Sequence, residues 1–290
     1  MSPLISASEL NEIKHQKNLV ILDASMEFTI PNAEPKIFGK VIPGARRFDY
    51  DHEFCDLSST LPHMMPNQAT FNAKAQQIGL NNDSHIVVYD NAGTYASPRA
   101  WWMLKAIGHH NVQVLNGGLK AWIDAGFETQ DNFEAVSQIG TFNGQIDPDY
   151  FLNADIVLKH SNLRSALIVD ARSMERFLAQ VPEPREGIRS GHIPGSLCLP
   201  FSQLMDKGHI KPLSGLQEAF ESLPLDQSKP IIFSCGSGVT ACILLLGAYL
   251  IGYKNLSVYD GSWTEWGANP QLPIEPQRRQ RQTEGKEWLE

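Results

Sequence analysis

The chain repeats its own sequence pattern once, and this repeat constrains the fold more than any other feature. Four landmarks occur in each half in the same order: an apolar run ending in aspartate, an Ile-Pro-Gly turn, a second apolar run followed by a small-residue loop, and a Gly-x4-Trp segment. Each landmark recurs roughly 145–150 residues after its first occurrence. The pairs are LVILDAS (19–25) with LIVDARS (167–173), KVIPGA (40–45) with GHIPGS (191–196), HIVVYDNAGTYAS (85–97) with PIIFSCGSGVTAC (230–242), and LNGGLKAW (115–122) with YDGSWTEW (259–266). We therefore expect a tandem duplication.

Each half is predicted to be an α/β domain. Short runs rich in β-branched residues alternate with helical patterns such as Ser97–Ile107 and Thr240–Ile251. Strands that are apolar throughout are typical of a mostly parallel sheet with helices on both faces. We expect domains at 1–127 and 150–276, a polar linker with three helix breakers at 128–149, and a polar tail at 277–290.

Composition excludes several classes of protein. The chain has 24 lysines and arginines against 32 aspartates and glutamates, a net charge of −8, which disfavours general binding to nucleic acid or to an anionic membrane. The most apolar run, Ala241–Ile251, is shorter than the roughly 20 residues that span a bilayer, and the N-terminus has no apolar signal segment. Four scattered cysteines with no Cys-x-x-Cys pair indicate neither a disulfide scaffold nor a zinc site. We expect a cytoplasmic protein with no metal and no cofactor.

The two copies differ at the end of one strand, where the first carries Asp90 and the second carries Cys235. Cys235 is followed by a short loop that opens a helix, so backbone N–H groups and the helix dipole favour an anion there. Such donors would stabilise a thiolate or the outer sulfur of a persulfide. Taken alone, a cysteine is more often a small buried hydrophobe, but this loop favours a nucleophile. The predicted cradle residues are Gly236, Ser237, Gly238, Val239 and Thr240.

Two other readings of this loop are weaker. Gly236-x-Gly238-x-x-Ala241, with Asp260 after the next strand, also fits a dinucleotide fingerprint, but too little chain follows for the second half of that fold. A cysteine phosphatase would need Cys-x5-Arg, and Ala241 stands in the arginine position.

Taken together and in order, these motifs resemble those of the tandem-rhodanese sulfurtransferases, and among them most closely the 3-mercaptopyruvate sulfurtransferases. The similar segments cover about Ile5 to Pro276. They include Leu61-Pro-His-Met-Met-Pro, Ser97-Pro-Arg, Asp170-Ala-Arg, Glu183-Pro-Arg, His192-Ile-Pro-Gly, Cys235-Gly-Ser-Gly-Val-Thr and Tyr259-Asp-Gly-Ser-Trp-Thr-Glu-Trp. The resemblance implies two rhodanese-like domains, the second catalytic, with the site in the cleft between them.

The resemblance also implies a reaction. Cys235 would take sulfur from 3-mercaptopyruvate, release pyruvate and pass the persulfide sulfur to cyanide, a thiol or a thioredoxin-like protein. Arg176 and Arg185 match the family's positions for the donor's carboxylate and keto oxygen, a role that suits guanidinium groups. Ser237 is implied in proton transfer with a histidine and an acid of the first domain. The family's first-half histidine before Ile-Pro-Gly corresponds here to Val41, which puts that form of relay in doubt.

Two alternatives remain open from the sequence. Thiosulfate could be the preferred donor, although the neutral Gly236 and Ser237 stand where thiosulfate-specific relatives carry cationic residues. A weakly catalytic rhodanese module that binds or carries sulfur for a partner is the other.

Overall fold

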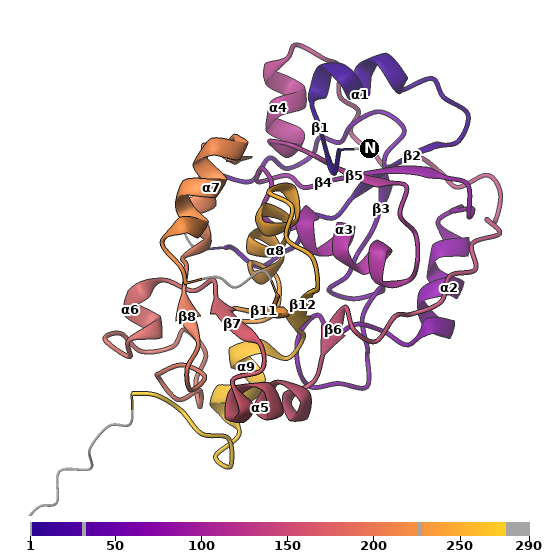
Figure 1. Ribbon diagram of the computed structural model, residues 1–290. Helices are drawn as coiled ribbons and strands as arrows, with labels where there is room; N and C mark the ends of the chain where they lie inside the picture. The colour runs from indigo at the N-terminus through magenta and orange to yellow at the C-terminus, as the bar shows by residue number, and fades with distance from the viewer. Residues whose placement is uncertain (1, 31–32, 225–227, 277–290) are drawn as a thin grey trace, which may run out of the picture.

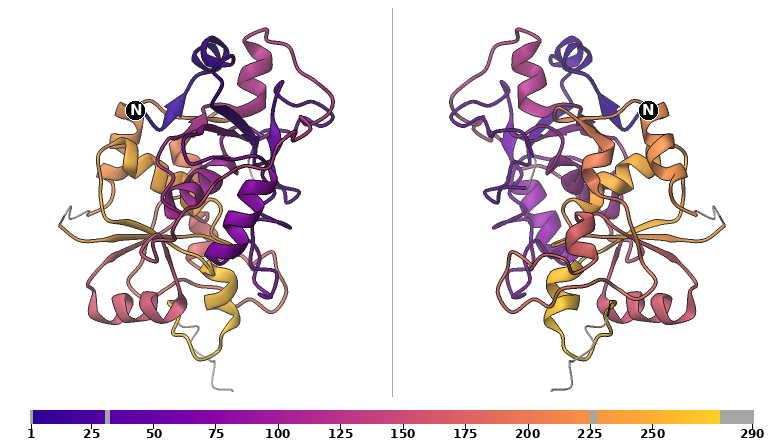
Figure 2. Two further views of the ribbon diagram at one scale, coloured as in Figure 1. Left: turned by 90° about the vertical axis from the view of Figure 1, so that its right-hand side faces the viewer. Right: turned by 90° about the vertical axis from the view of Figure 1, so that its left-hand side faces the viewer.

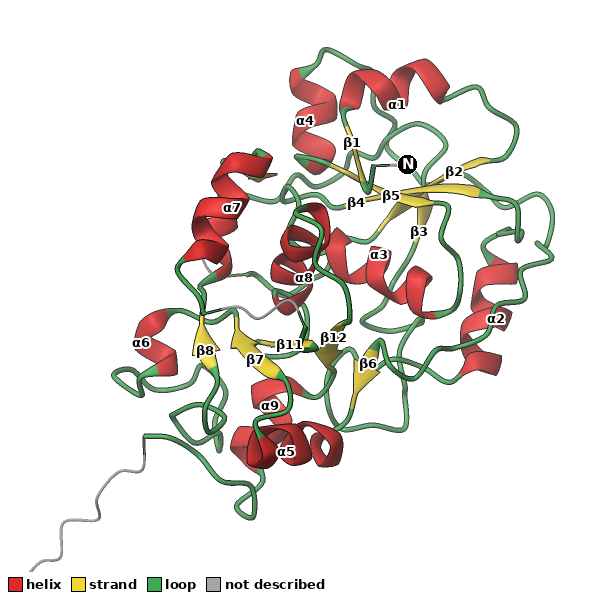
Figure 3. Ribbon diagram, viewed as in Figure 1, coloured by secondary structure: helices red, strands yellow, loops and turns green. Residues whose placement is uncertain are grey.

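Two sheets of the same design form the framework of the protein (Figures 1 and 3). The computed structural model describes residues 2–30, 33–224 and 228–276. The first sheet has the order β1-β5-β4-β2-β3 and is parallel throughout. Its strands are Leu4–Ile5 (β1), Leu19–Asp23 (β2), Arg46–Arg47 (β3), His85–Tyr89 (β4) and Val112–Leu115 (β5).

The second sheet repeats this order as β6-β12-β11-β7-β8, again parallel. Its strands are Phe151–Leu152 (β6), Leu167–Asp170 (β7), Leu197–Cys198 (β8), Ile231–Ser234 (β11) and Leu256–Tyr259 (β12). Each strand thus has a counterpart at the same place in the other sheet. The predicted α/β fold with two parallel-sheet domains is confirmed.

Helices cover both faces of each sheet. In the first half they are Ala7–Ile13 (α1), Gln68–Gln77 (α2), Ser97–Ala106 (α3) and Gly118–Asp124 (α4). In the second half they are Ala154–Leu163 (α5), Met174–Phe177 (α6), the 3-10 turn Phe201–Leu204 (η1), Leu213–Glu221 (α7), Ala241–Leu250 (α8) and Ser262–Ala268 (α9), with a hairpin of Met205–Asp206 (β9) and His209–Ile210 (β10). The layers can be followed in the side views of Figure 2.

The largest apolar core is shared by the two domains. Helices α3 and α8 lie against each other between the sheets (Figure 1), and Trp101 and Leu104 of α3 belong to the same buried cluster as Leu244 and Leu245 of α8. Smaller cores lie on the outer face of each sheet. Every residue of α3 is buried, which a helix exposed on an isolated domain would not show. The two copies are therefore packed as one body through their equivalent helices.

The central strands explain why the site lies where it does. All residues of β4 and β11 are buried, as expected for strands covered on both faces. Because all strands of a sheet run parallel, their carboxyl ends meet at one edge, where ligands bind in open α/β sheets. Asp90 follows β4 and Cys235 follows β11 at this edge.

The stretch predicted as a linker, 128–149, contains no helix or strand of the described structure and runs along the first domain. Phe142 is buried in the shared core, and the backbone of Gln130 pairs with that of Val41. Gly140 donates its N–H to the carbonyl of Gln76 (2.8 Å). The segment is thus anchored on the first domain along much of its length. The predicted polar tail, 277–290, lies outside the described residues.

Among the residues that the structure describes, no helix combines the length and the apolar character needed to cross a bilayer.

Candidate active site

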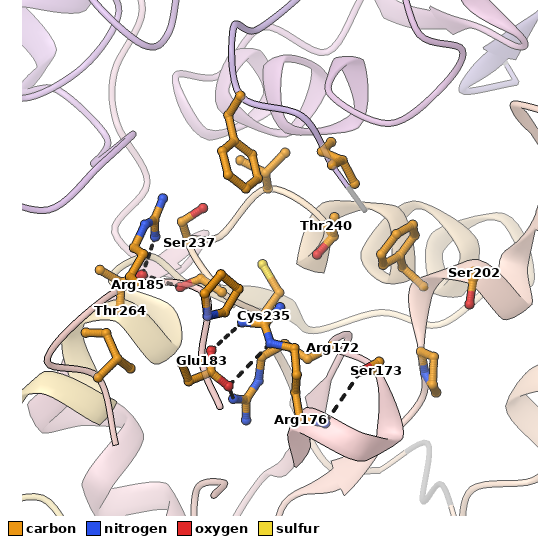
Figure 4. Close-up of a pocket in the computed structure, with 18 residues that line it drawn as sticks. Arg172, Ser173, Arg176, Glu183, Arg185, Ser202, Cys235, Ser237, Thr240 and Thr264 are labelled. Atoms are coloured by element: carbon orange, nitrogen blue, oxygen red, sulfur yellow. Dashed lines mark hydrogen bonds and ion pairs between the residues drawn. The ribbon is translucent and has the colours of Figure 1, made fainter. Parts of the chain in front are cut away.

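Cys235 lines a cavity of about 200 Å³ and is only 2% exposed. It directly follows β11, and its sulfur points into the cavity (Figure 4). The walls come mostly from the second domain, while Phe28 and Ile30 of the first domain close one side. The predicted cradle residues Gly236, Ser237, Val239 and Thr240 line this cavity as well. The cavity is of the size that suits a small organic acid.

The beginning of the loop is hydrogen-bonded to helix α9. The N–H of Cys235 donates to Ser262 Oγ (3.2 Å), and its carbonyl accepts from the N–H of Trp263 (2.9 Å). The carbonyl of Gly236 accepts from both the N–H and the hydroxyl of Thr264, at 2.9 and 2.6 Å. These bonds hold the loop carbonyls away from the cavity, so the next N–H groups are left for another acceptor. Within the described part of the chain, the N–H groups of residues 236–240 have no acceptor.

The first copy shows what such a loop holds. There the carboxylate of Asp90 accepts from the N–H groups of Tyr95 (3.1 Å), Ala96 (2.9 Å) and Ser97 (2.8 Å) and from the Ser97 hydroxyl (2.8 Å). An internal carboxylate therefore fills the anion cradle at the start of α3. In the second copy the equivalent position is the thiol of Cys235, and residues of the loop before α8 line the cavity. The loop after β11 thus has the same place in its domain as the loop that holds the Asp90 carboxylate.

Arg176 and Arg185, the two predicted donor-binding residues, both line the cavity but differ in their partners. Arg176 pairs with Glu183 through Nη2 and Nε, and Glu183 also accepts from Arg172 Nη1 (2.7 Å). Arg185 donates from Nη1 to Thr264 Oγ1 (2.5 Å) and lies over the Phe28 ring at 5.8 Å. Figure 4 shows these groups around the Cys235 sulfur. Arg185 is thus the guanidinium of this wall without a carboxylate partner among the described residues.

Arg172 and Glu183 are wall residues to which the sequence analysis gave no role. Arg172 is buried, pairs with Asp170 (Nη2 to Oδ2, 2.7 Å) and stacks over Trp263 at 4.3 Å. The sequence shows its motif, Asp170-Ala-Arg, but not that the Arg172 guanidinium binds the carboxylates of both Asp170 and Glu183. The cluster holds three arginines against two carboxylates, so one positive charge remains for a ligand.

Gly238 is the cradle residue that does not line the cavity. Its φ of +76° lies in the left-handed region, and an added Cβ would come within 2.6 Å of Arg99 Nη1. Arg99 belongs to α3 of the first domain and donates to the Gly238 carbonyl (3.1 Å) and to Asp260 Oδ1 (2.7 Å). The segment Ser97-Pro-Arg was singled out in the sequence without a role for the arginine, because its partners are far away along the chain.

The histidines occupy distinct places. His63 is buried and its Nδ1 lies 2.6 Å from Asp51 Oδ1 in the first domain. Burial would raise the pKa of Asp51, but the hydrogen bond and charge of His63 hold this pKa below its ordinary value. His192 stacks on Phe177 and its Nδ1 contacts the Phe177 carbonyl (2.8 Å), a structural setting outside the cavity lining. Val41 pairs with Gln130 and is also absent from the lining.

The remaining cysteines lie in other environments. Burial raises the pKa of Cys55 and Cys242, and raises that of Cys198 to about 12. The Cys242 thiol points along α8 to the Gly238 carbonyl (3.3 Å). Raised pKa values disfavour the thiolate, which is the reactive form of cysteine.

The surroundings of Asp260 argue against the dinucleotide-binding alternative. Asp260, which would bind a ribose hydroxyl, is buried, with one oxygen bound by Arg99 and the other by the N–H of Met65 (2.7 Å). Both carboxylate oxygens are therefore engaged inside the protein. The helix after the loop, α8, begins at Ala241, where a phosphatase would place its arginine.

Comparison with known proteins gives consistent results. Residues 6–125 and 153–269 each match the rhodanese-like domain. A 3-mercaptopyruvate sulfurtransferase of Escherichia coli strain K12 is 41% identical over 235 residues, which cover 81% of this chain and 83% of that protein. A thiosulfate sulfurtransferase of Gallus gallus is 40% identical over 242 residues, covering 80% and 81%. The crystal structure of SseA, a 3-mercaptopyruvate sulfotransferase of Escherichia coli, superposes with a TM-score of 0.79 at 35% identity, covering 91% of this chain and 99% of that one.

Proposed function

The chain belongs to the rhodanese family, with the domain present twice, and from this premise we propose that it is a 3-mercaptopyruvate sulfurtransferase that works through a persulfide on Cys235. The observation that carries the proposal is the setting of the Cys235 sulfur. It lies in a small cavity that is also lined by loop residues and by Arg185. Among the described residues, the N–H groups of this loop have no acceptor and Arg185 has no carboxylate partner. Cysteine, anion cradle and cationic wall are what the two steps of sulfur transfer require.

In the first step, the Cys235 thiolate attacks the sulfur of 3-mercaptopyruvate. An S–S bond forms, and the C–S bond breaks with its electron pair moving to carbon as the enolate of pyruvate. The proton of the donor's thiol ends on that carbon, so the products are pyruvate and an ionised Cys235 persulfide. We assign Gly236, Ser237, Gly238, Val239 and Thr240 to the cradle that stabilises the persulfide charge. The Ser237 hydroxyl is assigned to the proton transfer.

Arg185, with Arg176, is assigned to the carboxylate and keto oxygen of the donor. A guanidinium matches a carboxylate with two parallel hydrogen bonds, and it stabilises negative charge that develops on the enolate oxygen. The wall carries one uncompensated positive charge, which suits the monoanionic 3-mercaptopyruvate better than the dianionic thiosulfate. The neutral residues Gly236 and Ser237, next to Cys235, also favour 3-mercaptopyruvate over thiosulfate as donor.

In the second step an acceptor attacks the outer sulfur and restores the thiolate. We propose cyanide, a low-molecular-weight thiol or a thioredoxin-like dithiol as acceptors, since each supplies a nucleophile for the terminal sulfur. The domain division 1–127, 128–149 and 150–276, with the second domain catalytic, belongs to the same proposal. So does a cytoplasmic setting, which the four unpaired cysteines support.

The decisive experiment is intact mass spectrometry after incubation with 3-mercaptopyruvate and no acceptor. We expect a gain of one sulfur, about 32 Da, that cyanide removes and that Cys235→Ser does not acquire. Release of pyruvate should match the sulfur gained. A gain of sulfur in Cys235→Ser at the wild-type rate would refute the proposal. Rates with thiosulfate in the same assay test the thiosulfate-preferring alternative, which requires a higher kcat/KM for thiosulfate.

A further inference from the structure

The first domain reaches the catalytic loop through one buried ion pair, Arg99 with Asp260. Arg99 is 0% exposed and Asp260 is 5% exposed. Arg99 extends from α3 in the first domain, and Asp260 follows β12 in the second. Their atoms Nη2 and Oδ1 are 2.7 Å apart. A buried ion pair is costly to desolvate and gives little net stability, so its presence between domains calls for a further role.

Arg99 binds the loop itself. Its Nη1 donates to the Gly238 carbonyl at 3.1 Å, and this carbonyl also accepts from Cys242 Sγ at 3.3 Å. Gly238 has no Cβ, and a Cβ would occupy the space that the guanidinium fills. Fixing the Gly238 carbonyl fixes the plane of the following peptide, whose N–H belongs to Val239 in the proposed cradle.

The same pair holds a second segment, the one that carries His63. Arg99 Nη2 donates to the His63 carbonyl, and Asp260 Oδ2 accepts from the N–H of Met65 at 2.7 Å. His63 in turn contacts Asp51. The pair therefore fixes the loop of the second domain and the His63 segment of the first domain against each other.

We propose that Arg99, together with Asp260, is a positioning residue for sulfur transfer: it orients the Cys235 loop from the non-catalytic domain. This inference rests on the proposed function, because it concerns the rate at which the Cys235 persulfide forms. Arg99 does not line the cavity of Cys235, and the loop residue to which it donates is Gly238, so it acts through Gly238. The duplicated domain is then a working part of the catalytic site, since its α3 supplies the guanidinium.

The test compares Arg99→Met, which removes all three bonds, with Arg99→Lys, which keeps a charge for Asp260 but cannot bridge three acceptors at once. The matched control is Arg46→Met. Arg46 is another first-domain arginine that donates to two carbonyls, those of Ile78 (2.8 Å) and Gly79 (3.1 Å), and none of these three residues lines the cavity. Single-turnover rates of pyruvate release are measured with 3-mercaptopyruvate. The amplitude of the persulfide mass gain counts active sites, so a loss of folded protein lowers the amplitude and leaves the rate per site unchanged.

We expect the rate per active site to fall about 100-fold in Arg99→Met and about tenfold in Arg99→Lys, since small misplacement of a reacting group has effects of this size. KM for 3-mercaptopyruvate should stay within about threefold, because Arg176 and Arg185 are untouched. Arg46→Met should keep the wild-type rate per site. If Arg99→Met yields no folded protein, Arg99→Lys decides.

A rate per site in Arg99→Lys within about twofold of wild type would overturn the inference. So would a raised KM at unchanged rate, which would place Arg99 in donor binding, or an equal fall in Arg46→Met. Failure of the wild-type protein to acquire sulfur on Cys235 would instead overturn the proposed function, so the two failures are distinguishable.

Discussion

Replacing Arg185 by alanine tests the charge balance of the donor cavity. Three guanidinium groups face two carboxylates in this wall, and Glu183 is shared by Arg172 and Arg176. Arg185 has the Thr264 hydroxyl as its polar partner at 2.5 Å. The positive charge left for a donor is therefore that of Arg185. Its loss should weaken the enzyme toward a carboxylate donor without breaking an ion pair of the wall.

The magnitude follows from the bonds that are lost. A hydrogen bond to a charged group contributes about 1.5–3 kcal/mol. Since 1.36 kcal/mol corresponds to tenfold in rate, kcat/KM for 3-mercaptopyruvate should fall about 10- to 150-fold in Arg185→Ala. Thiosulfate has no planar carboxylate to match the guanidinium with two parallel hydrogen bonds. We expect its kcat/KM to fall by a smaller factor than that of 3-mercaptopyruvate in the same variant.

The assay is steady-state sulfur transfer to cyanide with each donor. Arg185→Lys restores the charge without the fork, so it should recover the thiosulfate rate more fully than the 3-mercaptopyruvate rate. Arg164→Ala is the control: this exposed arginine of the second domain donates to the Pro194 carbonyl at 3.0 Å, away from the cavity. Equal losses with both donors in Arg185→Ala would refute the carboxylate role.

Three further predictions concern the framework of the site. Gly238→Ala should lower the free energy of unfolding in urea by more than Gly252→Ala: both have positive φ, which costs about 1 kcal/mol, but a Cβ at Gly238 also meets Arg99 and the Asp260 carbonyl at 2.6 and 2.9 Å, whereas Gly252 faces open space. Equal losses would contradict the steric argument. Asp90→Asn should lower this free energy by about 1–3 kcal/mol, because a neutral amide replaces the carboxylate that accepts from the N–H groups of Tyr95, Ala96 and Ser97. The rate per active site should stay at the wild-type value, and an unchanged free energy of unfolding would refute the role of Asp90 in this loop. Burial raises the pKa of Glu265 above its ordinary 4.5, so this carboxyl ionises at a lower pH in the unfolded chain than in the folded protein. The free energy of unfolding of the wild type should therefore fall as pH rises from about 4.5 through the folded-state pKa. Glu265→Gln should lack this fall in urea titrations between pH 4 and 7, and parallel curves for the two proteins would contradict the prediction.

The strands were the most predictable part of the fold. The runs LVILD, LIVD, IIFS and LSVY match β2, β7, β11 and β12 residue for residue, because each strand is buried on both faces and so forms a continuous apolar run. The predicted helices Ser97–Ile107 and Thr240–Ile251 each end within one residue of α3 and α8. Elements that are buried along their whole length have a continuous apolar sequence, so a single sequence is enough to predict them.

The partners of the charged residues were not predictable in the same way. The anion cradle could be predicted because it is local: a strand, a small-residue loop and a helix start are contiguous in the sequence. Arg99 meets Asp260 across 161 positions, and Arg185 meets Thr264 across 79. Neither periodicity nor composition constrains contacts at such separations, because they depend on the tertiary fold, and for Arg99 also on how the two domains dock. The packing of Phe142 on Phe71 of the first domain is likewise a contact between positions far apart in the chain, and the polar sequence around Phe142 does not predict it.

Under the proposed function, the two copies have different tasks. In the first copy, Asp90 supplies the negative charge that the loop donors need, so this loop is complete without a ligand and α3 begins on a satisfied cap. Because the N–H groups of this loop already have an acceptor, we do not expect it to bind a sulfur donor. Its helix α3 is then free to serve packing, and it is buried along its whole length against α8. Arg99 of α3 extends into this interface and binds the carbonyl of Gly238, in the loop whose N–H groups have no acceptor among the described residues. Duplication thus separates two requirements that conflict in a single domain: the loop of the first copy is satisfied by its own carboxylate, and the helix that follows it positions the loop of the second copy.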